Sequence, residues 1–93
     1  VVGWNEGRIE QSGTTGTTKS IDGFANTGGL VGWNAGGATI YQCFASGAVT
    51  NSAASDGGNT GGLVGFNAGV ISNSHASGDV SDTSNGFKGG LVG

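Results

Sequence analysis

The chain has 93 residues, of which 22 are glycine, and it has no proline or methionine. A chain of this length forms at most one domain, and since only 34% of its residues are hydrophobic, and most of those are small, we expect a thin core. The net charge is −3 with three basic residues, which excludes a surface that follows nucleic-acid phosphates. No apolar run approaches the roughly 20 residues of a membrane-spanning helix.

One short motif recurs along the whole chain. It is entered at residues 1–5, is complete as Gly-Gly-Leu-Val-Gly-Trp-Asn at 28–34 and as Gly-Gly-Leu-Val-Gly-Phe-Asn at 61–67, and begins again at 89–93. The steps between equivalent valines, at positions 2, 31, 64 and 92, are 29, 33 and 28 residues. Periods of this size are typical of solenoids, propellers and other repeat arrays. We therefore treat residues 1–93 as one block with repeat units of about 2–30, 31–63 and 64–91.

Each unit is expected to form short β-strands. The abundant glycine disfavours helix, at about 0.8–1 kcal/mol per residue relative to alanine, and no segment has apolar residues at helical spacing. Residues 29–33 and 39–45 read as strands because turn-forming Gly, Asn, Ser and Asp bound them. One short strand cannot bury a face alone, but copies stacked about 4.8 Å apart can. The prediction is an all-β fold, a β-solenoid of about three coils with 28–33 residues per coil and short stacked strands.

Stacking would place equivalent residues in columns. The aligned units give an aromatic column, an asparagine column and two aliphatic columns: Trp4/Trp33/Phe66, Asn5/Asn34/Asn67, Ile9/Ile40/Ile71 and Leu30/Leu63/Leu91. Each stacked ring pair contributes about 0.5–1.5 kcal/mol beyond burial, and asparagine amides bond along stacked strands. These residues form the predicted structural ladder. The recurrent glycines are expected at corners with positive φ or where backbones approach closely.

Two units depart from the common pattern. Residues 11–18 of the first unit lack the aromatic and apolar side chains of the other two, which predicts a looser coil or an interface. The second unit has two additional residues near Gly37 and Ala38, where we expect a bulge or a longer corner.

Catalytic chemistry is not expected. A β-helical lyase or hydrolase needs acids and bases that converge on one groove, whereas the six carboxylates fall in different columns: Glu6, Glu10, Asp22, Asp56, Asp79 and Asp82. The only histidine, His75, lies in an outward column without a partner at ligand spacing. The only cysteine, Cys43, aligns with serines in the other units, which indicates a small packing residue. We predict no enzyme activity and no catalytic, cofactor-binding or metal-binding residue.

Two other stretches have alternative interpretations. Residues 79–86 carry oxygen donors at alternating positions, as calcium loops do, but they lack the closing glutamate. Turn formation accounts for the same residue types. Residues 14–18 resemble the threonine arrays of ice-binding solenoids, yet their columns hold other residues in the remaining units. We therefore favour a structural interpretation of both stretches.

The combined pattern resembles the GLUG-motif repeat family. Gly-Gly-Leu-Val-Gly-aromatic-Asn is followed by Gly-x-Ile-x-Asn-Ser-x-Ala-Ser-Gly-x-Val, a pattern carried best by residues 61–80. The resemblance covers the whole chain, with both halves in order. It implies a β-solenoid in a large secreted or cell-surface protein of bacteria or archaea, often adhesin-like, and hence an extracellular location. It implies no catalytic residue.

The chain starts and stops within the repeat, and an uncapped solenoid edge is a template for further strands. The expected end-to-end interface consists of Val1, Val2, Gly3, Trp4, Leu91, Val92 and Gly93. We expect head-to-tail stacking on copies of itself or on adjacent repeats, which would build an extracellular filament or a long cell-surface stalk. The alternative function is an adhesin module that binds a glycan or a host-surface protein through Tyr41 or Phe44 on its flank.

Overall fold

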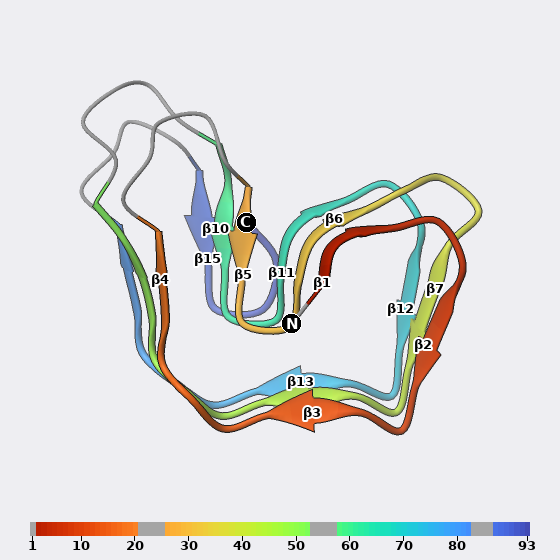
Figure 1. The fold of residues 1–93 in the computed structure, drawn as a ribbon, viewed down its shortest axis with the longest axis horizontal. Helices are drawn as coiled ribbons and strands as arrows, with labels where there is room; N and C mark the ends of the chain where they lie inside the picture. The colour runs from red at the N-terminus through yellow and green to blue at the C-terminus, as the bar shows by residue number, and fades with distance from the viewer. Residues whose placement is uncertain (1, 21–25, 53–57, 83–86) are drawn as a thin grey trace.

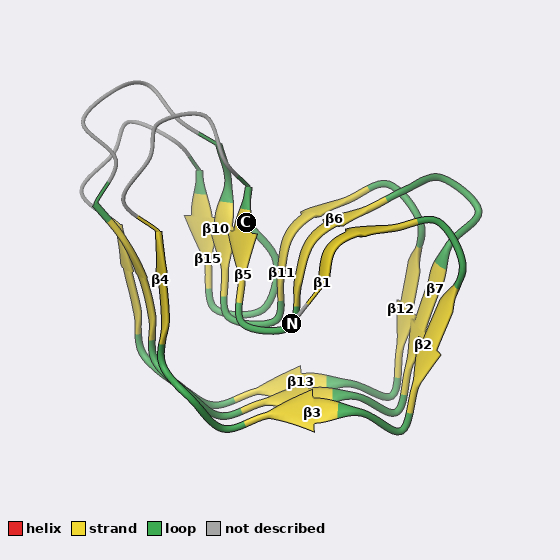
Figure 2. Cartoon of the chain, viewed as in Figure 1, coloured by secondary structure: helices red, strands yellow, loops and turns green. Residues whose placement is uncertain are grey.

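The computed structural model describes residues 2–20, 26–52, 58–82 and 87–93. Within them the chain forms fifteen short β-strands and no helix, which confirms the all-β prediction (Figure 2). The strands fall into three successive coils of five. Coil 1 comprises β1 (Val2–Asn5), β2 (Arg8–Glu10), β3 (Gly13–Thr14), β4 (Thr18–Ser20) and β5 (Thr27–Gly28). Coil 2 comprises β6 (Val31–Asn34), β7 (Thr39–Tyr41), β8 (Phe44–Ala45), β9 (Val49–Asn51) and β10 (Thr60–Gly61). Coil 3 comprises β11 (Val64–Asn67), β12 (Val70–Ser72), β13 (His75–Ala76), β14 (Val80–Asp82) and β15 (Lys88–Gly89).

Each strand pairs in parallel with the strand five places further along the chain. This gives five three-stranded sheets, which we number in chain order: sheet 1 (β1-β6-β11), sheet 2 (β2-β7-β12), sheet 3 (β3-β8-β13), sheet 4 (β4-β9-β14) and sheet 5 (β5-β10-β15). The register coincides with the alignment of the repeats, since Trp4 faces Trp33 and Ile9 faces Ile40. The three coils therefore superimpose when viewed down the stack (Figure 1).

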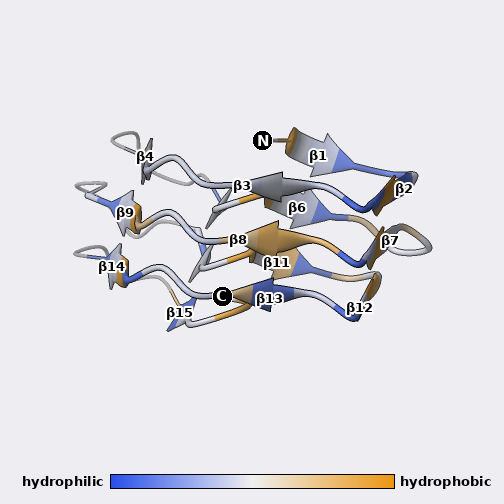
Figure 3. Ribbon diagram, turned by 90° about the horizontal axis from the view of Figure 1, so that it is seen from below, coloured by the Kyte–Doolittle hydropathy of each residue, from blue (hydrophilic) through white to orange (hydrophobic). Residues whose placement is uncertain are grey.

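The block is flat. Its extents are 33 × 24 × 16 Å, and Figure 1 looks along the shortest of them. Seen from the side, the coils lie one above the other, with the N-terminus at coil 1 and the C-terminus at coil 3 (Figure 3). Three coils thus make a slab wider than it is high, and a rod requires more coils.

The core is thin and centred on coil 2. The fully buried apolar side chains that form one cluster are Leu30, Val31, Ile40, Cys43, Ala45, Leu63 and Val64. Ile9 and Ile71, which stack on Ile40 from the outer coils, are only partly buried. Within the described residues each outer coil is covered on one side, whereas coil 2 is covered on both. The side chains of coil 2 are therefore the most buried.

The Gly-Gly-Leu-Val-Gly motif forms an inward fold between sheets 5 and 1, visible at the centre of Figure 1. Its glycines are required by close contact. A Cβ on Gly61 would lie 2.0 Å from the Val64 carbonyl oxygen, and one on Gly65 would lie 2.6 Å from the Thr27 nitrogen. A Cβ on Gly62 would lie 2.0 Å from the Gly90 carbonyl oxygen. The two sheets diverge from a seam of touching backbones that only glycine permits.

The corner between sheets 2 and 3 corrects part of the sequence prediction. Positive φ at this corner falls on Gln11 (50°), Gln42 (53°) and Asn73 (50°), and not on glycine. In each coil the following residue donates from its side chain to the carbonyl before the corner, as Ser74 Oγ does to Ser72 O at 2.9 Å. Among the described glycines only Gly37 has positive φ, at 82°. Most recurrent glycines are therefore explained by close approach.

The two departures from the repeat have simple outcomes. The additional residues of coil 2 form a longer corner between β6 and β7, closed by the Ala38 N–H, which donates to the Ala35 carbonyl at 3.0 Å. Coil 1 forms the same five strands as its neighbours despite its unusual residues 11–18.

Candidate functional site

Equivalent residues contact one another from coil to coil, and the first example is the leucine column of Leu30, Leu63 and Leu91. The Leu30 N–H donates to the Leu63 carbonyl at 2.9 Å, and the Leu63 N–H donates to the Leu91 carbonyl at 2.9 Å. Leu30 and Leu63 are 3% and 0% exposed, whereas Leu91 is 38% exposed. Each leucine is thus anchored by backbone to the next coil, and the outermost member lies at the surface of coil 3.

The asparagine column forms a continuous side-chain ladder at the ends of β1, β6 and β11. Asn5 Nδ2 donates to Asn34 Oδ1 at 2.8 Å, and Asn34 Nδ2 donates to Asn67 Oδ1 at 2.8 Å. The outer members also bond locally: Asn5 Oδ1 accepts from the Gly7 N–H, and Asn67 Oδ1 accepts from the Gly69 N–H. Asn34 is fully buried, so this ladder satisfies an amide that would otherwise be costly to bury.

The ladder has a direction. Both bonds between its asparagines run from an amide N–H of the lower-numbered coil to an amide oxygen of the next. Coil 3 therefore presents the Asn67 amide as a donor, and coil 1 presents the Asn5 amide oxygen as an acceptor. The two faces of the block are complementary and not identical.

The aromatic column stacks beside the asparagine ladder. The Trp4 and Trp33 ring centroids are 4.9 Å apart with planes at 6°, and those of Trp33 and Phe66 are 4.3 Å apart at 27°. Trp4 is 57% exposed; its indole N–H donates to Glu6 Oε1 at 3.0 Å. The tryptophan at the coil 1 face thus keeps one ring face open.

Two further polar columns lie where sheets 4 and 5 come together, and the sequence alignment did not single them out. Asn51 Nδ2 donates to Thr60 Oγ1 at 3.0 Å, and both residues are buried. In coil 3 the corresponding positions are Asp82 and Lys88, and Lys88 Nζ donates to the Asp82 carbonyl at 3.1 Å. The signal in the sequence is that polar residues recur in both columns, Ser20/Asn51/Asp82 and Thr27/Thr60/Lys88.

The beginning and the end of the described chain contribute to the same column of valines. Val2 pairs with Val31, Val31 with Val64, and Val64 with Val92. Val92 therefore continues the valine column by one level beyond coil 3. Val1, which was predicted for the end-to-end interface, lies outside the described residues.

The candidate chemical groups do not converge. Glu10 pairs with Arg8 at 3.1 Å, and both side chains are more than half exposed. His75 is exposed and stacks on Phe44, with ring centroids 5.9 Å apart. Asp22, Asp56 and residues 83–86 of the calcium-like stretch lie outside the described part of the chain. In the part that is described, no group of three or more His, Cys, Asp or Glu side chains could hold a metal ion.

Cys43 is a packing residue by its contacts. It is 1% exposed, and its thiol lies 3.3 Å from the Tyr41 carbonyl, where the serines of coils 1 and 3 place their hydroxyls.

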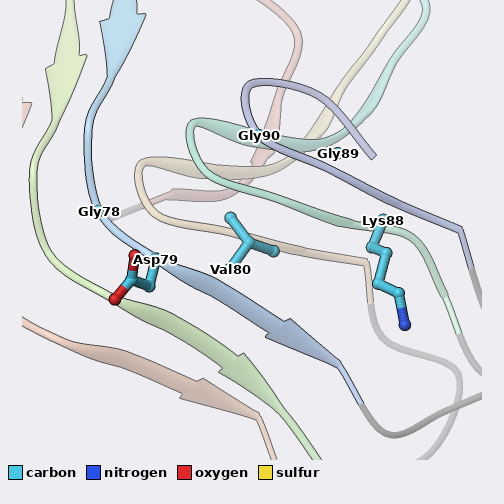
Figure 4. Close-up of a pocket in the computed structure, with 6 residues that line it drawn as sticks. All are labelled: Gly78, Asp79, Val80, Lys88, Gly89 and Gly90. Atoms are coloured by element: carbon cyan, nitrogen blue, oxygen red, sulfur yellow. The ribbon is translucent and has the colours of Figure 1, made fainter.

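A pocket of about 360 Å³ opens on coil 3, between β14 and β15 (Figure 4). It is lined by Gly78, Asp79, Val80, Lys88, Gly89 and Gly90. The Asp79 and Lys88 side chains lie at opposite sides of it, so no acid–base pair is formed. Half of the lining residues are glycines, which have no side chains to fill the space. The pocket is therefore a hollow in coil 3 where few functional groups meet.

The flank around the corner of sheets 2 and 3 carries the residues of the alternative prediction. The Arg8 guanidinium lies 5.2 Å from the centre of the half-buried Tyr41 ring. Phe44 is 37% exposed and covers Gly13, where a Cβ would lie 2.2 Å from the ring. Gln42, which follows Tyr41 in the chain, accepts a bond at Oε1 from Gln11 Nε2 at 3.4 Å. Aromatic and amide groups thus adjoin on one outer surface.

Comparison with known proteins identifies the repeat. The family model described as the GLUG motif matches residues 25–55 and 56–81, which is more than half of the chain. The first match contains β5 to β9, and the second runs from β10 into β14. No curated protein and no solved structure matches. The described residues contain no helix that could cross a lipid bilayer. With two consecutive matches in the phase of the observed coils, the chain belongs to the GLUG-motif family.

Proposed function

We propose that the chain is a structural building block of an extracellular filament or long cell-surface stalk, in which it forms three coils of a β-solenoid. The observation that carries the proposal is the periodicity of the coil-to-coil contacts. Backbone bonds, asparagine amides and aromatic rings each join a residue to its equivalent in the next coil. Because each contact joins equivalent residues, further coils would repeat the same contacts, and this role requires no catalytic residue.

Several features support an elongated assembly. Solenoid stability is a sum of intrinsic repeat terms and nearest-neighbour terms, so further coils bury the surfaces that the outer coils leave open. Trp4 and Leu91 are exposed at 57% and 38%, although their equivalents in coil 2 are more buried. The extracellular location follows from membership of the family and is part of the proposal. No catalytic residue, cofactor, nucleic acid or membrane span is assigned.

Electron microscopy and diffraction of the material as isolated test this function. Stacked coils predict long unbranched filaments with a layer line at about 4.8 Å, and a three-coil period predicts an axial repeat of about 14 Å. Dispersed particles without the layer line would contradict the proposal.

A second candidate is an adhesin module that binds a glycan on its flank. The juxtaposition of Tyr41, Phe44 and the Gln42 amide favours it, because sugar rings pack on aromatic faces while amides bond hydroxyl groups. Glycan-array binding of Tyr41→Ala and Phe44→Ala variants tests this candidate. Phe87→Ala is the matched control, since Phe87 is 79% exposed and lies beside sheet 5. Binding that is absent, or unchanged by the first two substitutions, would dismiss it.

A further inference from the structure

The aromatic column contains a pair of stacked indoles in coils 1 and 2, whereas coil 3 has a phenylalanine at the equivalent place. The Trp4 and Trp33 ring centroids are 4.9 Å apart, and the ring planes lie at 6°. This is the separation of a stacked aromatic pair. Trp33 has a ring on each side and is still only half-buried. The pair is therefore accessible from the flank of the block, independently of what covers the ends of the stack.

A carboxylate is hydrogen-bonded to this pair. The Trp4 indole N–H donates to Glu6 Oε1 at 3.0 Å, in the corner between β1 and β2. The equivalent positions in the other two units, 35 and 68, are alanines, so the carboxylate is a feature of coil 1 and not of the repeat. An indole nitrogen only donates and a carboxylate only accepts, which fixes the direction of the bond. Glu6 thus places a proton acceptor directly on the indole N–H.

We propose that Trp4 and Trp33 form a one-electron donor site with Glu6 as its proton acceptor, and that its substrate is an outer-sphere one-electron oxidant at the protein surface. This activity is separate from the proposed structural function. One electron leaves the indole pair and reduces the oxidant. The N–H bond of Trp4 breaks, and its proton moves to Glu6 Oε1. The products are a neutral indolyl radical, a protonated carboxyl group and the oxidant reduced by one electron.

The geometry favours each part of this step. An indole that has lost an electron is a much stronger acid than neutral indole, and a proton acceptor must lie within hydrogen-bond reach to take its proton. Glu6 meets that condition at 3.0 Å. The parallel ring of Trp33 allows the positive charge to spread over two indoles before the proton leaves. Phe66, on the other side of Trp33, is far harder to oxidise, so the charge stays on the pair.

The other oxidisable side chains are less suited to this role. The chain has no methionine, one cysteine and one tyrosine. Cys43 is 1% exposed, so an oxidant at the surface does not reach it. Tyr41 is half-buried, and the Arg8 guanidinium lies 5.2 Å from its ring centre. A positive charge at that distance opposes the loss of an electron from the ring. The indole pair is therefore the expected electron donor.

Laser flash photolysis tests the site. A ruthenium polypyridine complex, oxidised to its trivalent state by flash–quench, is mixed with the 93-residue chain in dilute solution. Transient absorption then distinguishes the neutral indolyl radical, the indole radical cation and the tyrosyl radical. The unsubstituted chain should yield the neutral indolyl radical, and more slowly in heavy water than in light water, because the proton moves with the electron.

Three variants separate the parts of the site. Glu6→Gln keeps an oxygen that accepts the indole bond but has no basic group, so oxidation should be severalfold slower, lose the isotope effect and yield the radical cation first. Glu10→Gln is the matched control, because it removes the same charge from an exposed position of coil 1 and corrects for attraction of the cationic oxidant. Trp33→Phe keeps a stacked ring without the second indole, and should also slow oxidation severalfold. Far-UV circular dichroism shows whether each variant remains folded.

The results either establish the site or overturn it. An isotope effect that Glu6→Gln abolishes and Glu10→Gln preserves, together with slower oxidation of Trp33→Phe, would establish the pair and its proton acceptor. Equal rates and isotope effects for Glu6→Gln and Glu10→Gln would show that the proton leaves to water and would overturn the role of Glu6. A tyrosyl radical as the first product, or a Trp33→Phe rate equal to that of the unsubstituted chain, would overturn the pair as the donor.

Discussion

Replacing Asn34 with alanine removes the centre of the asparagine ladder. The side chain is 0% exposed and makes two bonds of 2.8 Å, one to Asn5 and one to Asn67. Each contributes about 1 kcal/mol net, and the buried partner groups left without these bonds add about 1–3 kcal/mol. Both partners keep local bonds to Gly7 and Gly69. The expected loss of unfolding free energy is therefore at the lower end of this range, about 3 kcal/mol.

The position in the ladder should decide the size of the loss. Asn67→Ala removes one bond between coils, at a partly exposed position where water replaces it, so a loss of about 1 kcal/mol is expected. Asn34→Asp should be at least as harmful as Asn34→Ala, because a carboxylate accepts but does not donate and would face the Asn67 oxygen in a buried site. These losses are a substantial fraction of the unfolding free energy of roughly 5–14 kcal/mol that is expected for a domain of this size.

Urea unfolding followed by far-UV circular dichroism measures the three free energies, at concentrations where the chain is monomeric. An unchanged slope with denaturant shows that the same surface unfolds in each variant. Equal losses for Asn34→Ala and Asn67→Ala would refute the ladder as a buried, position-dependent element. Asn34→Asp that is more stable than Asn34→Ala would refute the requirement for a side-chain donor at this position.

Three further predictions concern the other columns, and the first two use the same unfolding assay. Gly62→Ala should destabilise the fold by about 1–3 kcal/mol through overpacking against the coil 3 backbone. Gly36→Ala is the control, because a Cβ there meets nothing within 4 Å and should leave the stability unchanged. Similar losses for both variants would contradict the explanation by close backbone approach. Trp33→Ala, which loses a ring partner on each side, should cost more than Trp4→Ala, which loses one, with about 0.5–1.5 kcal/mol per ring pair; the reverse order would argue against stacking. Cys43, at 1% exposure, should react with a water-soluble thiol reagent only when the chain unfolds, and rapid labelling of the native protein would show that the core opens locally.

The register, the residue columns and the fold class can be predicted from the sequence repeat. The recurrence of the motif at Val2, Val31 and Val64 determines which residues face one another, since parallel stacking in register is the arrangement that keeps every equivalent residue adjacent. The aromatic and asparagine columns follow from the same alignment. The all-β class follows from the glycine content and from the short strands bounded by turn residues.

The roles of individual glycines were not readable in this way. A glycine in a sequence is compatible both with positive φ and with a close backbone, and only the three-dimensional path distinguishes these. The path places Gln11, Gln42 and Asn73 at the positive-φ corner. It places Gly61 and Gly65 in the seam of the inward fold.

The sequence by itself determined the period, the fold class and the columns, because these depend on the spacing of like residues along the chain. Only the tertiary structure decided the flat, inwardly folded coil, the Asn51–Thr60 contact between sheets 4 and 5, and the direction of the amide ladder. The first two features depend on how five sheets close around a thin core, and the Asn51–Thr60 contact joins residues whose separation along the chain differs from the repeat. The direction of the ladder is a choice between two orientations of the same amides, which the spacing of the asparagines does not determine. The physical reason is that stacking between coils is local to a column, whereas packing across a coil couples different columns.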